Sequence, residues 1–136
     1  MSNSLNTSPT PANTKRGAAE YFSGTSWVTM LADENPTDCI VGTVTFEPGV
    51  RNSWHSHPSG QILVVSAGTG YYQEKGQHAR LLRAGDAVII APDVVHWHGA
   101  SATSLFAHYF INPGASHGLT DWLEPVTDEE YRAAHA

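Results

Sequence analysis

The sequence predicts an all-β domain, a sandwich or a barrel of short strands. Apolar side chains recur at every second position along Cys39–Phe46, so Ile40, Val44 and Phe46 fall on one face of an extended chain. Short β-rich segments recur with glycine-containing turns between them at intervals of roughly 8–12 residues, which is typical of all-β domains. A helical pattern stands out only at the C-terminus.

The predicted strands are rich in β-branched, aromatic or other apolar residues and end at turn residues. Gly68–Gly70 and Gly85–Asp86 predict turns, and Lys75–Gly76 predicts the tip of a hairpin. In chain order we expect strands at Ser26–Leu31, Cys39–Phe46, Gln61–Val65, Tyr71–Glu74, Ala79–Leu82, Ala87–Ile90 and Leu105–Asn112.

The ends of the chain differ from this middle part. Residues 1–16 are rich in Ser, Thr, Asn and Pro, which predicts a flexible tail ahead of a single domain at 17–136. Thr127 and Glu130 have the spacing of a capping box, so we expect a short helix from about Asp128.

Composition excludes several functional classes. The formal net charge is −6 and the seven Lys and Arg residues are scattered, so nothing favours binding to nucleic acid or to an anionic membrane. The single cysteine, Cys39, cannot form an intramolecular disulfide and is interpreted as a small strand residue. The N-terminal residues lack the apolar run of a secretory signal, so we expect a cytoplasmic protein.

In each of three pairs of polar residues, the spacing would place both members on the same face of a strand. Residues two apart on a strand point to the same face, so each pair can direct both side chains into a barrel interior. The pairs are His55 and His57, His96 and His98, and, with the same parity on the last long strand, His108 and Asn112.

These residues predict a metal site. Imidazole binds several divalent first-row metals, and an amide oxygen suits the harder ones. His55, His57 and His96 together with Gln61 would supply three nitrogens and one oxygen and would leave positions open for water or substrate. For any one histidine alone, a hydrogen-bonded structural role would be the better interpretation.

The order of these residues resembles the two sequence motifs of the cupin family. Gly49–Gly68, which contains His55, His57 and Gln61, resembles the first motif, G-x5-H-x-H-x3-4-E-x6-G. Gly85–His96 resembles the second motif, G-x5-P-x-G-x2-H-x3-N. The resemblance implies a double-stranded β-helix, or jelly-roll barrel, with a metal-binding core at about residues 39–112.

Several positions depart from these motifs. Pro92 comes one residue late, Val94 replaces the usual glycine, and Ala100 replaces the terminal asparagine. Gln61 stands where the family usually has glutamate. A neutral ligand in place of a carboxylate would leave a bound metal more cationic and a stronger Lewis acid.

Three segments resemble a narrower group, the small bacterial cupins with hydroxynitrile lyase activity. This resemblance implies manganese bound by His55, His57, Gln61 and His96, with iron, nickel or zinc as alternatives. It also implies that a further histidine, matched by His98, acts beside the metal, and that His108 matches a histidine on the last strand. The three segments are Trp54–Gln61, Pro92–Ala100 and Asp121–Tyr131.

The remaining site candidates each have two interpretations. His98 is either the general acid or base of a reaction or a residue that orients a ligand. His108 and Asn112 either line a substrate pocket or hydrogen-bond the barrel wall, and Val44 and Phe46 are expected as pocket wall or core. Trp54 and Trp97, out of register with the histidines, should pack on the outer face or between subunits.

The leading functional hypothesis is a metal-dependent lyase that cleaves or forms a cyanohydrin, with His98 and His108 as catalytic residues and a small molecule as substrate. The alternatives are an iron-dependent dioxygenase or other redox cupin, and a non-catalytic small-molecule-binding cupin. A strand-like segment at Ser26–Leu31 and abundant Trp and Tyr also predict a homodimer or homotetramer.

Overall fold

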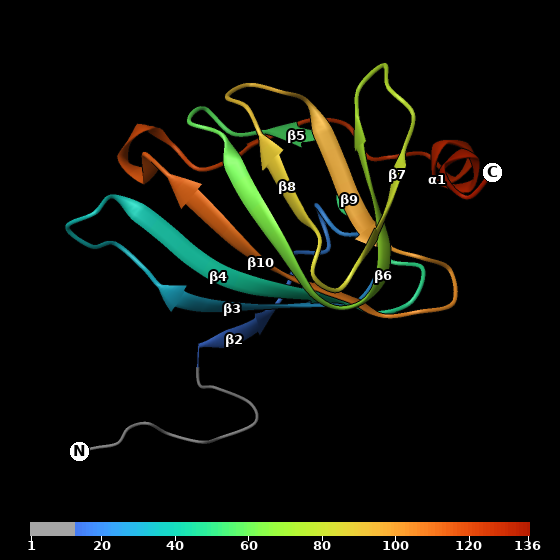
Figure 1. Ribbon diagram of the computed structural model, residues 1–136, viewed down its shortest axis with the longest axis horizontal. Coiled ribbons are helices and arrows are strands. Elements are labelled where there is room, and N and C mark those ends of the chain that lie inside the picture. Colours follow the sequence, from blue (N-terminus) through green and yellow to red (C-terminus); the bar gives the residue numbers. More distant parts are fainter. Residues whose placement is uncertain (1–12) are drawn as a thin grey trace.

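The structure, a computed structural model, describes residues 13–136 as one curled antiparallel sheet that forms a half-barrel, with a short C-terminal helix beside it (Figure 1). The strand order is β11-β5-β9-β6-β10-β4-β3-β2, and β7 and β8 also pair with β6. The predicted all-β class is confirmed. The strands are β2 (Thr14–Arg16), β3 (Ser26–Ala32), β4 (Cys39–Phe46), β5 (His55–Ser56), β6 (Gln61–Glu74), β7 (Arg80–Arg83), β8 (Ala87–Ile90), β9 (His96–Ala100), β10 (Phe106–Pro113) and β11 (Asp121–Trp122), and the helices are the 3-10 helix η1 (Ala115–His117) and α1 (Asp128–Ala134).

Strand β6 is the longest and joins the two parts of the half-barrel. Its first half pairs with β8 and β10, and its second half pairs with β7 and β9. The predicted turn at Gly68–Gly70 is therefore wrong, because the chain stays extended through it. Gly68 has φ 73°, which lets the strand bend without ending. A Cβ atom on Gly70 would lie 2.4 Å from the carbonyl oxygen of Gly99, so only glycine lets these two strands approach so closely.

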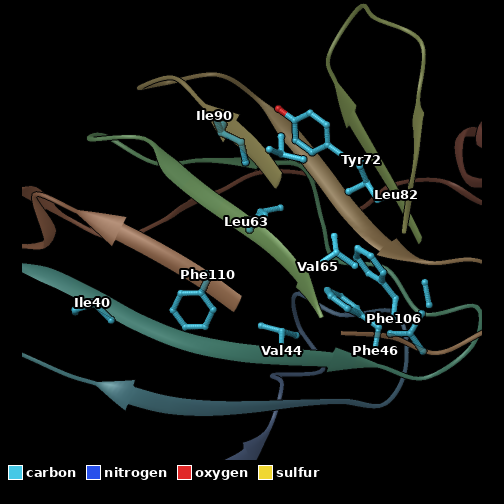
Figure 2. Close-up of a cluster of buried hydrophobic side chains, with 13 residues drawn as sticks. Ile40, Val44, Phe46, Leu63, Val65, Tyr72, Leu82, Ile90, Phe106 and Phe110 are labelled. Atoms are coloured by element: carbon cyan, nitrogen blue, oxygen red, sulfur yellow. The ribbon is translucent and has the colours of Figure 1, made fainter. Parts of the chain in front are cut away.

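The apolar core fills the inside of the curled sheet (Figure 2). The alternation along β4 buries Ile40, Val44 and Phe46 as predicted, and Leu63 from β6 is fully buried between them and the neighbouring strands. On β6 and β10 the same inward face also carries buried polar residues, namely Gln61, His108 and Asn112. These polar side chains therefore lie next to the apolar core.

The N-terminal boundary of the domain lies earlier than expected. Residues 14–16 of the predicted tail form β2, which pairs with β3 in register from Thr14 opposite Thr29 to Arg16 opposite Trp27. The rest of that predicted tail, residues 1–12, lies outside the described residues. Short strands β5, β9 and β11 were not predicted as separate elements, since two to five residues carry too little periodicity.

The C-terminal helix confirms the predicted capping box. The Thr127 side chain accepts a hydrogen bond from the Glu130 amide at 3.0 Å, and the Glu130 carboxylate accepts one from the Thr127 amide at 2.9 Å. Tyr131 of α1 packs with Trp54 and Trp97 in a cluster separate from the barrel core, so both tryptophans lie on the outer side of the sheet. At seven residues, α1 is too short to cross a membrane, and no other helix of the described chain could do so.

The cap of α1 makes a testable contribution to stability. Replacing Thr127 with Ala removes one hydrogen bond to an otherwise unpaired backbone N–H, so the free energy of unfolding should fall by about 1 kcal/mol. Denaturant unfolding measures this change. Thr127→Ser keeps the hydroxyl and should stay close to the parent protein. Equal unfolding midpoints for Thr127→Ala and the parent would contradict the assigned cap.

Candidate metal centre

The polar residues singled out in the sequence lie together on the inner face of the half-barrel. His55 on β5 pairs directly with His96 on β9, and their ring centroids are 4.2 Å apart. The His57 ring follows at 5.0 Å from His55 and 5.3 Å from His96. Gln61 opens β6, and Asn112 lies on β10, so four strands bring their residues together at this point.

A shared hydrogen-bond pattern orients the three histidines proposed as ligands. The Nδ1 atom of each contacts a backbone carbonyl oxygen, which can only accept, so Nδ1 must carry the hydrogen. In a neutral ring Nε2 then holds a free lone pair. The three pairs are His55 with Ser53 at 2.7 Å, His57 with Leu119 at 2.6 Å and His96 with Val94 at 2.9 Å.

Gln61 is oriented in a comparable way. Its amide Nε2 donates to Oδ1 of Asn112 at 2.9 Å, which leaves the carbonyl oxygen Oε1 on the opposite side of the amide. Within residues 13–136, Gln61 Oε1, His57 Nε2 and His96 Nε2 are buried without a hydrogen-bond partner. Buried acceptors rarely stay unpaired. A cation among them would satisfy all three, so the residues present fit a bound metal.

Burial keeps these imidazoles neutral. It is the largest cause that lowers the pKa of His55 well below its usual value, and the nearby rings of His96 and His57 lower it further. Burial also lowers the pKa of His96 to about 4, although its hydrogen bond to Val94 acts in the opposite direction. The pKa of His57 is lowered for the same main reason. Neutral imidazole is the form that binds a metal ion.

Three buried histidines, His55, His96 and His98, have ring nitrogens that all lie within 4.8 Å of one another, a cluster that suits a divalent metal. This cluster contains His98 where the sequence-based ligand set has His57. His98 Nδ1 contacts Nε2 of His108 at 3.1 Å, whereas His57 Nε2 is buried without a hydrogen-bond partner in the described chain. We therefore keep His57 in the ligand set, and this assignment stays a prediction.

A cavity of about 220 Å³ opens beside the histidines. Val44, His108 and Asn112 line it, but Phe46 does not. The Phe46 ring is fully buried behind the cavity and packs against His98, with 5.8 Å between their ring centroids. Other residues lining the cavity include Phe22, Val28, Met30, Ile40, Asn52, His55, His57, Gln61, His98, Phe110, Leu119, Thr120 and Trp122.

Sequence reasoning missed three contributors to this site. Trp122 of β11 pairs with His55, and its ring lies 4.7 Å from the His55 ring at the cavity wall. Leu119 supplies the carbonyl that orients His57. Asn52 is buried and contacts His98. The position of Asn52, three residues before His55, was the only sequence signal for the three. The Leu119 carbonyl and the aromatic contact of Trp122 leave no pattern in the sequence.

Two known proteins resemble this chain over most of its length. The chain is 41% identical over 118 residues to a protein named (R)-mandelonitrile lyase from Granulicella tundricola, covering 86% of this chain and 90% of that protein. Among solved structures, a cupin-like protein from Thermotoga maritima matches with a TM-score of 0.85 and 47% identity, covering 88% of this chain and 91% of the other.

A protein with a double-stranded β-helix domain from Klebsiella pneumoniae matches with a TM-score of 0.63 at 22% identity, covering 86% of this chain and 90% of the other, which shows the fold alone. Residues 42–111 match the cupin domain, which is more than half of the chain. The fold, the two motifs and these matches agree, and the chain belongs to the cupin family.

Proposed function

We propose that this protein is a metal-dependent lyase that cleaves a cyanohydrin into a carbonyl compound and hydrogen cyanide, and forms it in reverse. The observation that carries the proposal is a buried imidazole, His98, that faces the cavity beside a cluster of unpaired ligand atoms. The 41% sequence identity to a protein named (R)-mandelonitrile lyase, over most of both chains, supports the same reaction class.

The proposed ligands are Nε2 of His55, His57 and His96 and Oε1 of Gln61. Three imidazoles with one neutral oxygen suit a divalent first-row metal, and we propose manganese. A bound ion of this kind supplies a Lewis acid, which makes a substrate hydroxyl easier to deprotonate. Asn112 contributes indirectly, because its hydrogen bond keeps the oxygen of Gln61 directed away from β10.

His98 is the proposed proton acceptor. Its ring is 3% exposed and lines the cavity, so it can reach a bound substrate but not bulk water. It takes the hydroxyl proton while the bond between the carbinol carbon and the cyano carbon breaks. The electron pair of that bond leaves with cyanide, which takes the proton from His98 and departs as hydrogen cyanide. The carbon left behind is then a carbonyl carbon, so atoms and charge balance.

The cavity walls favour a small apolar substituent on the substrate. Val28, Met30 and Phe110 form part of one wall, and Trp122 closes the side next to His55. At about 220 Å³ the cavity is smaller than a typical drug-sized pocket, so it suits a compact molecule.

The metal is tested by elemental analysis of protein purified without chelators. We expect one divalent ion per chain, and His55→Ala and His57→Ala should each remove most of it, because each leaves an incomplete ligand set. His117→Ala, at an exposed histidine of η1, is the matched control and should keep the metal. The site would be refuted if parent protein from metal-supplemented medium held less than about a tenth of an ion per chain.

The role of His98 is tested with His98→Ala and with the larger His98→Gln, which leaves less of a void. Both should keep metal and fold but lose turnover of a cyanohydrin by about 10²–10⁴-fold, the usual contribution of a positioned proton-transfer group. Cyanide release, metal content and thermal unfolding are measured together, with the exposed His78→Ala as control.

Loss of metal in both His98 variants would make His98 a ligand instead. Full activity in both would mean that the proton follows another route, with His108 the next candidate. A parent protein that releases no cyanide from aromatic or aliphatic cyanohydrins would refute the reaction class. Turnover of any substrate that requires dioxygen would point to a redox cupin.

We also propose a homodimer or homotetramer, built on the outer face of the sheet. Ile89, Ile62, Ile111 and Val41 lie side by side across β8, β6, β10 and β4, and all four point away from the core. Ile89 is 71% exposed. An uncharged apolar row of this kind can pack against the same row of a second copy across a two-fold axis.

The assembly is tested by light scattering at micromolar concentration. We expect a mass of two or four times the 14.6 kDa of one chain. Ile89→Lys should shift the mass toward 14.6 kDa, since a charge would be buried in the interface. Leu81→Lys, at an exposed apolar residue of β7, is the matched control. A parent protein of 14.6 kDa would contradict the proposal.

A further inference from the structure

The chain between β10 and β11 forms part of the cavity rim. We call residues 114–120, which contain η1, the rim segment, and Figure 1 shows it as the coil beyond the end of β10. Leu119 and Thr120 line the cavity, and Leu119 is also 40% exposed, so it lies where the cavity meets solvent. The Leu119 carbonyl oxygen accepts the hydrogen bond from Nδ1 of His57. The rim segment therefore contacts both the cavity and a proposed metal ligand.

Leu119 belongs to neither a helix nor a strand, so its position depends on the contacts on each side of it. On the C-terminal side, Asp121 and Trp122 of β11 pair with β5. On the N-terminal side, Gly118 has φ 114°, a conformation that favours glycine, and it has no side chain with which to pack. The firm support on this side must therefore come from η1.

Asp38 holds η1 against the barrel. Its backbone carbonyl accepts a hydrogen bond from the Ala115 N–H at 3.0 Å. Its carboxylate accepts one from the Ser116 N–H at 2.8 Å and another from the Ser116 hydroxyl at 2.7 Å. Within residues 13–136, every hydrogen bond between η1 and the chain outside the rim segment goes to Asp38. Ala115 also packs against the barrel core, so η1 has one apolar contact in addition.

The turn between β3 and β4 fixes Asp38 in turn. The Asn35 side chain donates to the Cys39 carbonyl at 2.8 Å and accepts from the Thr37 N–H at 2.9 Å. The Asp38 N–H donates to the Asn35 carbonyl at 3.0 Å. Asp38 has φ 54°, a left-handed conformation that Asp and Asn adopt more readily than most other residues. The carboxylate is thus carried by a constrained backbone, which makes it a firm support.

We infer that Asp38 is a positioning residue for the proposed metal ligand His57, because it fixes η1 and thereby keeps the Leu119 carbonyl within hydrogen-bond distance of the His57 ring. The inference rests on the proposed function, in which His57 binds the metal. Without the carboxylate, η1 loses two of its three hydrogen bonds to Asp38 and can move away from the barrel as Gly118 changes conformation. The His57 ring then loses part of its support, and a less firmly oriented ligand binds metal more weakly.

Asp38→Gly tests the inference without straining the backbone. It removes both carboxylate contacts but keeps the backbone carbonyl, and glycine adopts φ 54° readily. Asp38→Asn is the conservative variant, because its side-chain oxygen can still accept from the Ser116 N–H and Asn tolerates the same conformation. Asp86→Gly is the matched control, since the Asp86 carboxylate accepts from the Arg83 N–H at 2.8 Å in a turn that does not line the cavity.

The first measurement is the dissociation constant for Mn²⁺, obtained on the full-length protein from the EPR signal of the free ion. In Asp38→Gly it should rise about tenfold, the lower end of the effect of losing a hydrogen bond that supports a metal ligand. The lower end applies because Ala115 still packs against the core. In Asp38→Asn and in Asp86→Gly the constant should stay near the parent value.

The second measurement is amide hydrogen exchange of the metal-free protein at His117 and Gly118. These N–H groups donate to carbonyls inside the rim segment and not to Asp38, so their exchange reports the mobility of the segment itself. Exchange at both should be faster in Asp38→Gly than in the parent, and it should return to the parent rate in Asp38→Asn.

A folded Asp38→Gly with the Mn²⁺ affinity of the parent would overturn the inference, even if its exchange were faster. Equal weakening in Asp86→Gly would overturn it too, because a general loss of stability would then explain the effect. If Asp38→Gly does not fold, Ser116→Ala, at an exposed residue, decides: a smaller rise in both quantities is expected, and parent values would overturn the inference. A parent protein that binds no Mn²⁺ would refute the proposed metal site and this role of Asp38 with it, whereas failure of the inference alone leaves the affinity of the parent intact.

Discussion

The hydrogen bonds from imidazole Nδ1 atoms to backbone carbonyls are the constraint on which the rest of this site depends. His55, His57 and His96 each make one, and each bond leaves the Nε2 lone pair of a neutral ring free. Two of these lone pairs, with the oxygen of Gln61, are buried without a partner in the described chain. Such an arrangement is costly by itself. It would become favourable if a cation bound these atoms, so the fold and the metal would stabilise each other.

The carbonyls that impose this constraint come from segments that are far apart in sequence. Ser53 and Val94 lie two residues before the histidines they orient, but Leu119 comes from the chain that follows the barrel. The same C-terminal part supplies Trp122 to the cavity wall and folds α1 against Trp54 and Trp97, on the opposite side of the sheet. The residues after β10 therefore complete the site as well as the outer surface.

Burial keeps the histidines of the site neutral, and a neutral imidazole suits both of the roles proposed for them. It lowers the pKa of every imidazole in the site, so the rings stay neutral at physiological pH. For His55 and His96, the proposed metal ligands, a neutral ring leaves Nε2 able to bind an ion. For His98, the proposed proton acceptor, a neutral ring keeps a lone pair that can take a proton, and its Nδ1 contacts His108. The hydrogen-bond partners, more than the residue type, distinguish these roles.

The sequence by itself determined which residues face inward. Strand parity put His55 with His57, His96 with His98, and His108 with Asn112, because alternation along a strand is a local property. Strand alternation does not show whether an inward side chain reaches the cavity. Val44 and Phe46 share a face, yet Val44 lines the cavity and Phe46 lies behind it.

The tertiary structure alone decided the partners of these residues. The Leu119 carbonyl, the Asn52 amide and the continuous path of β6 through Gly68 depend on contacts between distant segments. A backbone carbonyl has no side-chain identity, so a sequence cannot show which histidine it will orient. The sequence therefore fixes the chemical groups available at the site, and the packing of distant segments fixes which nitrogen of each ring is free.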